Sequence, residues 1–221
     1  MPKIPTIDEL FDTGHTIIAP LIKDFKYPHE LIGKIKEIIP YLTERLGRRY
    51  LEIKKGVFVA DDAKIWDGAT IEAPTIIGHK TEVRPGAFIR GNVIIGDGAV
   101  IGNSTEIKNS IIFDEAKLPH YNYVGDSIIG YRSHMGAGCV ASNLRLDKGE
   151  ICYNIDGEIV NTGLKKLGVM LGDYAEVGCG CVLCPGAIVG RECVIYPRAL
   201  FKGIISERCI YNGSEIKEIQ G

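Results

Sequence analysis

Hydrophobic residues recur at every sixth position along the middle of the chain. An α-helix repeats its apolar face about every 3.6 residues and a half-buried strand every two, so neither element explains this period. A mostly small residue follows four positions later, and glycine often stands beside it, as sharp corners around a narrow core require. Three such hexads make one coil of a triangular prism. The first repeat positions are Val59, Ile65, Ile71, Ile77, Val83, Ile89, Ile95, Ile101, Ile107 and Phe113.

The same period returns twice further along the chain. A short central run contains Ile129, Met135 and Ala141, and a last block runs from Leu171 to Phe201 at intervals of six. Together the blocks predict about six coils. We therefore expect an all-β fold, a parallel β-helix.

Two interruptions divide the repeat. Phe113 and Ile129 are sixteen residues apart instead of twelve, which predicts a bulge of about four residues that carries His120. The second break spans residues 143–168, with Asp156-Gly157 at its centre. This dipeptide is typical of a type I′ turn, so the second break predicts an inserted β-hairpin loop.

The segment before the repeat has a different pattern. Residues 28–47 show helical apolar spacing, and we expect Pro40 to break or kink that helix. A short helical segment in front of a solenoid is typical of a cap on its open end. The predicted organisation is a helical cap over residues 1–56, a β-helix domain over 57–205 and a tail over 206–221.

Charge and composition exclude several classes of protein. The 221 residues carry a formal net charge of −2, so the basic field that nucleic-acid binding needs is missing. Charged residues interrupt every long apolar run, so we expect no membrane span and a cytoplasmic location. The seven cysteines are expected to be free thiols. Cys179, Cys181 and Cys184 lack a second ligand pair at zinc-site spacing, which favours packing over metal binding.

Several motifs follow one another in the repeat region with a specific order and spacing. They are Arg84-Pro85-Gly86-Ala87, Glu106-Ile107-Lys108-Asn109-Ser110, His120 to Ser127, Met135-Gly136-Ala137-Gly138, Ser142-Asn143-Leu144-Arg145 and Lys165-Lys166-Leu167-Gly168. Over roughly residues 57–205 this arrangement resembles the C-terminal acetyltransferase domain of glucosamine-1-phosphate acetyltransferase/N-acetylglucosamine-1-phosphate uridylyltransferase, the archaeal-type members especially. The resemblance implies a left-handed β-helix of hexapeptide repeats and a parallel homotrimer that binds ligands between its prisms.

The resemblance also implies a catalytic pair. His120 aligns with the family's general base, which accepts a proton as the amine of the sugar attacks the acetyl thioester, and an imidazole suits proton transfer near neutral pH. Glu106 aligns with the carboxylate that orients this histidine. Strand alternation independently places Glu106 and Lys108 on the outer face, on either side of the inward Ile107. The alternative interpretations are a solvated His120 and an exposed ion pair between Glu106 and Lys108.

The remaining candidates concern the two substrates, again by resemblance. Asn143, the third candidate catalytic residue, and the backbone near Ala137 would contact the acetyl group and the pantetheine arm. The candidate acceptor-binding residues are Arg84, Lys108, Tyr123 and Lys166, with Lys165 an open alternative to Lys166, and the candidate cofactor-binding residues are Ala137, Cys179 and Arg198. Arg191 and Lys202 are further candidates for the phosphates of coenzyme A. Three cations around one small site fit a phosphorylated acceptor.

The implied function is N-acetylation of an amino-sugar phosphate, such as glucosamine-1-phosphate, with acetyl-CoA as co-substrate and no metal. We expect no uridylyltransferase activity, because residues 1–56 are too short for that domain. His134 and Leu144 depart from residues common in the family, which leaves the acceptor open. Two alternatives remain: a non-catalytic sugar-phosphate-binding subunit, and a γ-class carbonic anhydrase, although the paired histidines of that class are missing here.

Overall fold

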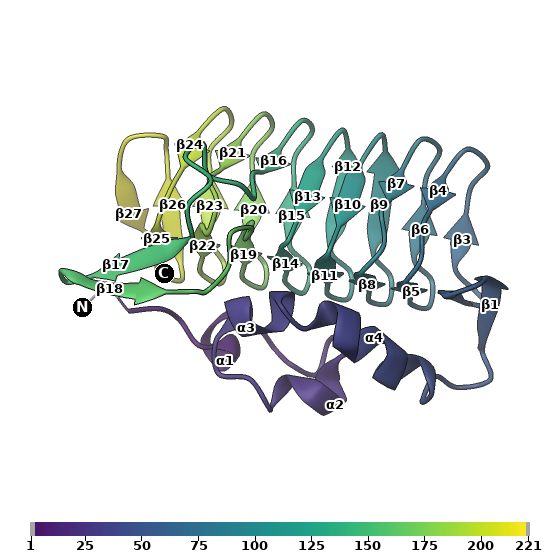
Figure 1. Cartoon of the computed structure of the whole chain (residues 1–221). Helices are drawn as coiled ribbons and strands as arrows, with labels where there is room; N and C mark the ends of the chain where they lie inside the picture. The colour runs from purple at the N-terminus through teal and green to yellow at the C-terminus, as the bar shows by residue number, and fades with distance from the viewer. Residues whose placement is uncertain (1–2, 220–221) are drawn as a thin grey trace.

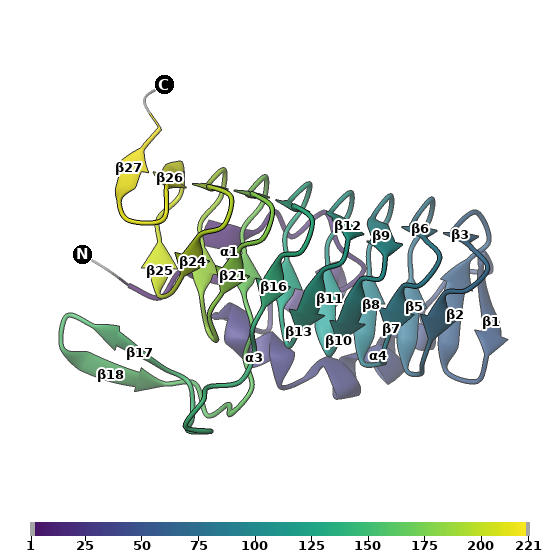
Figure 2. The same ribbon diagram turned by 90° about the horizontal axis from the view of Figure 1, so that it is seen from above.

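A triangular prism built from three mainly parallel sheets forms the body of the protein (Figures 1 and 2). The computed structural model describes residues 3–219. Each coil contributes one short strand to sheet A, one to sheet B and one to sheet C, and the coils stack as a left-handed β-helix. Inward side chains from all three sheets form one continuous core.

The strands of the three sheets follow the chain in a regular rotation. Sheet A contains β1 (Tyr50–Lys54), β2 (Val57–Ala60), β5 (Thr75–Ile77), β8 (Val93–Ile95), β11 (Ser110–Ile112), β14 (Ile128–Ile129), β19 (Met170–Leu171), β22 (Ile188–Val189) and β25 (Ile204–Ile205). Sheet B contains β3 (Lys64–Ile65), β6 (Glu82–Val83), β9 (Val100–Asn103), β12 (Lys117–His120), β15 (His134–Met135), β20 (Glu176–Val177), β23 (Val194–Ile195), β26 (Cys209–Tyr211) and β27 (Ile216–Glu218). Sheet C contains β4 (Thr70–Ile71), β7 (Phe88–Ile89), β10 (Glu106–Lys108), β13 (Tyr123–Gly125), β16 (Val140–Ala141), β21 (Val182–Leu183) and β24 (Leu200–Phe201).

Seven coils have all three strands, and β25 and β26 begin an eighth, so the expectation of about six coils was too low. The coil that was overlooked has Ile112, Leu118 and Val124 in the core. Phe113 does not point into the prism. Its side chain lies outside sheet A, in a second apolar cluster that sheet A forms with the N-terminal helices. The predicted bulge is therefore wrong. The four residues assigned to the bulge belong to a regular coil, whose first inward residue is Ile112 instead of Phe113. His120 lies at the end of β12.

Irregular spacing of the inward residues is confined to one edge of the prism, where sheet C passes to sheet A. The step across this edge shortens to five residues between Ile107 and Ile112 and between Val124 and Ile129, and the inserted loop leaves here after Ala141. We call it the C–A edge. Steps across the other two edges keep the six-residue interval along the repeat. A solenoid tolerates changes of length on one edge because the strand stacking on its faces is preserved.

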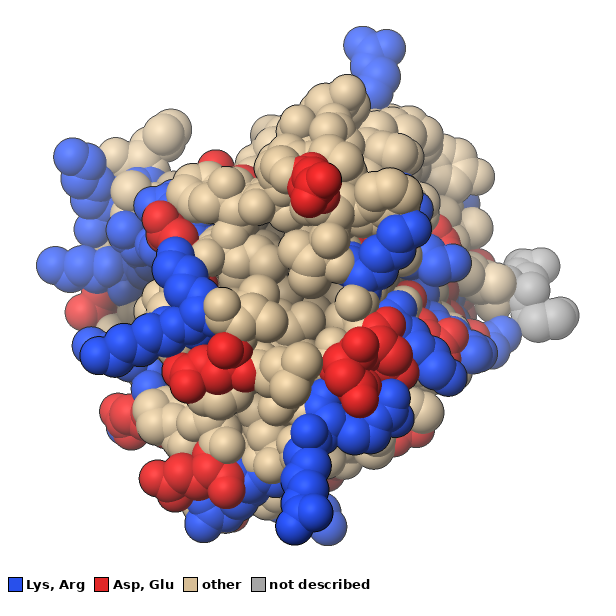
Figure 3. All heavy atoms as spheres, turned by 90° about the vertical axis from the view of Figure 1, so that its right-hand side faces the viewer, with Lys and Arg blue, Asp and Glu red and all other residues tan. Residues whose placement is uncertain are grey.

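The N-terminal helices lie along the outside of sheet A and do not cap the end of the prism (Figure 1). They are α1 (Ile7–Leu10), α2 (Ala19–Ile22), α3 (Pro28–Ile32) and α4 (Ile35–Thr43). Sheet A presents isoleucines outward on β5, β8, β11 and β14, and the helices bury them. The helices leave the β1 end of the prism uncovered, and there charges of both signs surround an uncharged centre (Figures 1 and 3). The expected cap is thus a lateral layer, since sheet A is apolar on both of its faces.

Two local predictions have different outcomes. Pro40 does not end its helix, because α4 continues to Thr43 and the helical break falls at Gly33 instead. The inserted loop does form the predicted hairpin: β17 (Cys152–Ile155) pairs antiparallel with β18 (Glu158–Asn161). Asp156 and Gly157 at its turn both have positive φ, as a type I′ turn requires.

Two further expectations concern composition. All seven cysteines are free, as expected, and Cys181 points into the core. Within residues 3–219, none of the helices has the length and apolar character needed to cross a bilayer.

Candidate active site

Two of the candidate residues, Glu106 and Tyr123, lie on the outer face of sheet C. Parallel pairing places Glu106 of β10 directly beside Tyr123 of β13, with Phe88 and Val140 on the flanking strands. Ile107 and Val124 point inward between these positions, as alternation predicted. Burial raises the pKa of the half-buried Tyr123 above its ordinary value, so its hydroxyl is a neutral hydrogen-bond donor near neutral pH.

His120, Ala137 and Cys179 occupy equivalent positions on three successive coils, at the edge where sheet B passes to sheet C. Backbone hydrogen bonds between the coils define this B–C edge column: Gly138 N donates to His120 O (3.1 Å), Gly180 N to Ala137 O (2.8 Å) and Arg198 N to Cys179 O (2.9 Å). Three of the predicted cofactor and catalytic positions, separated by up to 59 residues of sequence, therefore form one row, and Arg198 follows directly above Cys179.

A shallow, largely apolar hollow of about 310 Å³ lies beside the same edge. Gly136 and Gly178 line it next to Cys179 and Tyr196. Gly136 is required here by close packing, because an added Cβ would lie 2.7 Å from the backbone nitrogen of Cys179. The Cys179 side chain is exposed at its rim.

Asp126 is the centre of a polar network at the C–A edge. Its buried carboxylate accepts a hydrogen bond from Asn109 Nδ2 (2.7 Å) and a short one from Asn143 Nδ2. Gly125 leaves room for the network, since a Cβ there would lie 2.6 Å from Asn143 Nδ2 and 2.7 Å from the Tyr123 hydroxyl. Tyr123 and Asn143 are therefore neighbours above Gly125.

The inserted loop returns to the prism at this network. Leu167 N donates to Asn143 O (3.0 Å), and Gly168 N donates to Asp126 O (2.7 Å). Lys166 forms an isolated antiparallel bridge with Leu144, and its side chain is exposed. Of the two lysines considered from the sequence, Lys166 is the one in this bridge. Lys108 lies one coil from the loop, where its carbonyl accepts from Asp126 N (2.9 Å).

Two charged side chains assigned to catalysis and binding have other partners in the single chain. Arg90 Nη1 donates to Glu106 Oε1 (2.7 Å), and Arg84 donates to Glu82 Oε2 through Nε (3.2 Å) and Nη2 (3.0 Å). Among residues 3–219 the His120 imidazole has no hydrogen-bond partner, although its backbone N–H donates to Asn122 Oδ1 (3.2 Å). The structure thus does not join Glu106 to His120, and Arg84 lies two coils below it on the same edge.

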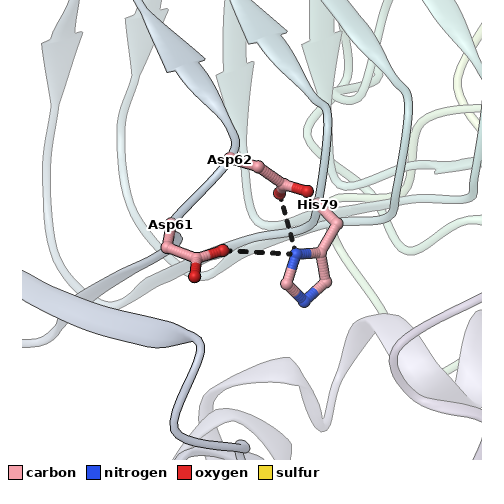
Figure 4. Close-up of side chains that lie close together, drawn as sticks. All are labelled: Asp61, Asp62 and His79. Carbon is pink, nitrogen blue, oxygen red and sulfur yellow. Dashed lines mark hydrogen bonds and ion pairs between the residues drawn. The ribbon is translucent and has the colours of Figure 1, made fainter.

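A second polar cluster lies at the third edge of the prism, where sheet A passes to sheet B (Figure 4). His79 Nδ1 lies 2.8 Å from Asp62 and 3.9 Å from Asp61. Within the described part of the chain this is the one trio of such side chains whose ligand atoms lie within 4.8 Å of one another. Arg49 already pairs with both carboxylates, at 2.8 Å and 3.1 Å. The cluster borders a hollow of about 640 Å³ and lies on a different edge of the prism from His120.

Three residues of the candidate region were not singled out from the sequence. Asp126 and Asn109 stand inside the quoted motifs without an assigned role, and Arg90 was not considered. Their signal was available: the hexad shortens immediately beside Asn109 and Asp126, and both adopt positive φ. Asparagine and aspartate in the left-handed region are typical of tight turns. His134, which departs from the residue common in the family, lies on sheet B, where its Nδ1 is 2.9 Å from Glu176 Oε2.

Comparison with known proteins supports one class. Residues 71–162 match the family model of the GMPPB C-terminal domain. A bifunctional sugar-1-phosphate nucleotidylyltransferase/acetyltransferase of Sulfurisphaera tokodaii is 37% identical over 150 residues, which cover 68% of this chain and 37% of that protein. The uncharacterized acetyltransferase YaiX of Escherichia coli is 30% identical over 202 residues, covering 82% of this chain and 84% of that protein.

Among solved structures, the acetyltransferase domain of PglB from Neisseria gonorrhoeae, in complex with acetyl coenzyme A, has a TM-score of 0.34 and 16% identity, with 84% of this chain and 67% of that chain covered. The chain spans about a third of the length of the first curated relatives that it matches.

A left-handed β-helix of hexapeptide coils defines the class of hexapeptide-repeat proteins. The chain belongs to the hexapeptide-repeat acyltransferases, and within them it is similar to the C-terminal acetyltransferase domains of the archaeal GlmU-type proteins.

Proposed function

We propose that the protein transfers an acetyl group from acetyl-CoA to the amine of an amino-sugar phosphate, with glucosamine-1-phosphate as the first candidate acceptor. One observation carries the proposal: His120 stands in a column with Ala137 and Cys179 on one side of sheet C, and the Tyr123–Asn143 network stands on the other side. The names of the archaeal relatives, which combine sugar-1-phosphate and acetyltransferase activities, agree with it.

The donor would lie along the B–C edge. The hollow beside Gly136 and Gly178 is apolar and spans successive coils, as a pantetheine arm requires. Arg198 is exposed at the upper end of the column and would contact the phosphates of coenzyme A. Backbone N–H groups at the coil corners would stabilise the negative charge that develops on the thioester oxygen.

The acceptor would span sheet C. A strand of two to three residues is about 7–10 Å long, which is comparable to a hexose phosphate. With the amine near His120, the phosphate would reach the C–A edge, where Lys108 and Lys166 supply positive charge. The amine nitrogen then forms a bond to the thioester carbon, His120 accepts the amine proton, and the coenzyme A thiolate leaves and takes that proton.

The candidate residues lie on an open face, so the site needs a second wall. On the outer face of sheet C, Val140, Val182 and Leu200 form an apolar stripe that continues the row of Glu106 and Tyr123, and Phe88 stands at the other end of that row. We propose that a neighbouring copy in a homotrimer covers this stripe and closes the site. Burying such a stripe against another copy would also exclude water from the thioester.

The test is thiol release from acetyl-CoA with glucosamine-1-phosphate at equal concentrations of folded protein. His120→Ala is expected to lower kcat by about a hundredfold or more, as loss of a general base does. His79→Ala, at the edge between sheets A and B, is the matched control and should keep full activity. Equal activity in wild type and His120→Ala would remove His120 from the mechanism.

One observation favours a second candidate, a non-catalytic sugar-phosphate-binding subunit. Glu106 is paired with Arg90, which leaves the His120 imidazole without its orienting carboxylate. Binding of glucosamine-1-phosphate without thiol release from any acceptor in a panel of amino sugars would decide for this alternative.

A further inference from the structure

Asp126 carries a buried carboxylate at the C–A edge of the candidate face. The residue is 5% exposed, and both carboxylate oxygens are used, Oδ1 by Asn109 and Oδ2 by Asn143. Its backbone is also fully engaged, because its N–H donates to Lys108 O and its carbonyl accepts from Gly168 N. Separate pieces of chain, from two neighbouring coils and both ends of the inserted loop, therefore meet at one residue.

This arrangement determines how Asn143 faces outward. Because its Nδ2 donates to Asp126, its Oδ1 points away from the carboxylate, and among residues 3–219 that oxygen has no hydrogen-bond partner. Asn143 therefore keeps one free hydrogen-bond acceptor, its Oδ1, while its Nδ2 lies beside the Tyr123 hydroxyl above Gly125. Without Asp126 the amide could rotate by half a turn, and the acceptor would be replaced by a donor.

Asp126 also holds both roots of the inserted loop. Asn143, at the departing root, bonds the carboxylate, and Gly168, at the returning root, bonds the carbonyl. Gly168 approaches so closely that a Cβ would lie 2.1 Å from the carbonyl oxygen of Gly125. Lys166 is two residues from this clamp and is fixed to Leu144 by the antiparallel bridge.

We infer that Asp126 is a positioning residue for the acceptor: it sets the Asn143 amide with its oxygen outward and holds Lys166 over the phosphate end of the face. The inference rests on the proposed function and concerns the same site. Asp126 itself is buried and touches no substrate.

The decisive variants exchange the two partners. Asp126→Asn keeps the left-handed backbone, which asparagine tolerates well, but turns the network into amides whose donors face one another. Asn143→Asp combined with Asp126→Asn reverses the polarity and restores both bonds, since the amide introduced at position 126 can accept from Asn109 and donate to the carboxylate introduced at position 143. The matched control is Asp147→Asn, which removes an exposed carboxylate of the loop that bonds Arg145.

Steady-state kinetics with acetyl-CoA and glucosamine-1-phosphate provide the first measurement. Asp126→Asn is expected to raise the KM for the acceptor about tenfold, with kcat lowered less than about threefold. The exchanged double variant also alters the proposed acetyl contact Asn143, so its expected signature is a lower acceptor KM than that of Asp126→Asn, whereas Asp147→Asn should match the wild type. Wild-type KM in Asp126→Asn overturns the inference. A folded double variant whose acceptor KM is about tenfold or more above that of the wild type also overturns it, and this comparison decides the matter even if Asp126→Asn alone fails to fold.

A second measurement separates this inference from the proposed function. The side-chain amide of Asn143, assigned by its loss in Asn143→Asp, is followed in ¹H–¹⁵N spectra of the wild type and of Asp126→Asn. A dispersed, exchange-protected pair of resonances that collapses in the variant supports the positioning role even if no acceptor is acetylated. Unchanged resonances overturn it.

Discussion

Arg90 and Glu106 form an ion pair of 2.7 Å between adjacent coils on the rim of sheet C. Glu106 is the carboxylate that the family resemblance assigns to His120, so Arg90 and His120 are two candidate partners for one acidic group. Which partner Glu106 keeps in the assembled enzyme determines whether the imidazole is oriented for proton transfer.

Replacing Arg90 with glutamine is expected to release Glu106 and to raise kcat/KM about two- to tenfold, because an oriented imidazole is a better base. Both side chains are about a third or more exposed, so the melting temperature should not change. Glu106→Gln should act in the opposite direction and lower kcat. A higher KM for the acceptor in Arg90→Gln would instead place Arg90 among the substrate contacts.

Asp173 fastens the N-terminal segment to the prism. Its fully buried carboxylate accepts from the backbone nitrogens of Tyr131 (2.8 Å) and Asp12 (2.5 Å) and lies 3.4 Å from Arg191. Asp173→Ala leaves these buried donors unpaired and should lower the free energy of unfolding by about 2–4 kcal/mol. Urea titration of this variant, beside exposed Asp67→Ala, measures the difference. Equal unfolding midpoints would contradict the role.

His29 should make stability depend on pH. It is buried between Tyr27, at 5.7 Å between ring centroids, and Tyr153 of the hairpin, at 6.2 Å, and Glu30 is the nearby charge. Burial lowers the pKa of His29, so the unfolded chain takes up a proton first as the pH falls below about 6.5. The free energy of unfolding should therefore decrease between pH 7.5 and pH 5.5. His29→Phe keeps an aromatic ring and should reduce that decrease. An unaltered pH dependence would exclude His29 as its source.

Phe113 stabilises the contact between the helices and sheet A. Its side chain is fully buried and its ring lies 5.0 Å from that of Phe11. Phe113→Ala is expected to cost about 3–5 kcal/mol, as other buried phenylalanines do. Limited proteolysis should then cut residues 1–49 faster while the coils stay protected. Faster cleavage of the coils themselves would instead place Phe113 in the prism core.

The hexad period by itself determined the architecture. A residue in a narrow triangular coil can point only inward or outward. Aliphatic residues at every sixth position therefore fit one arrangement, a three-sided coil with these residues inside. The turn at Asp156-Gly157 was equally local, since few dipeptides accept two positive φ angles. The coil around Leu118 was missed because a one-residue deletion at Asn109 shifts the register, and a fixed period cannot distinguish a short step from an insertion.

For the site, the motifs identified which residues to consider, and the tertiary structure decided their neighbours. His120, Ala137 and Cys179 form one column only because the coils stack in register across the inserted loop. The pairing of Glu106 with Arg90, the burial of Asp126 and the position of the helices along sheet A depend on contacts between distant segments. Sequence spacing specifies the face on which a side chain lies, whereas its partner is selected by whichever group the folded chain brings within hydrogen-bond distance.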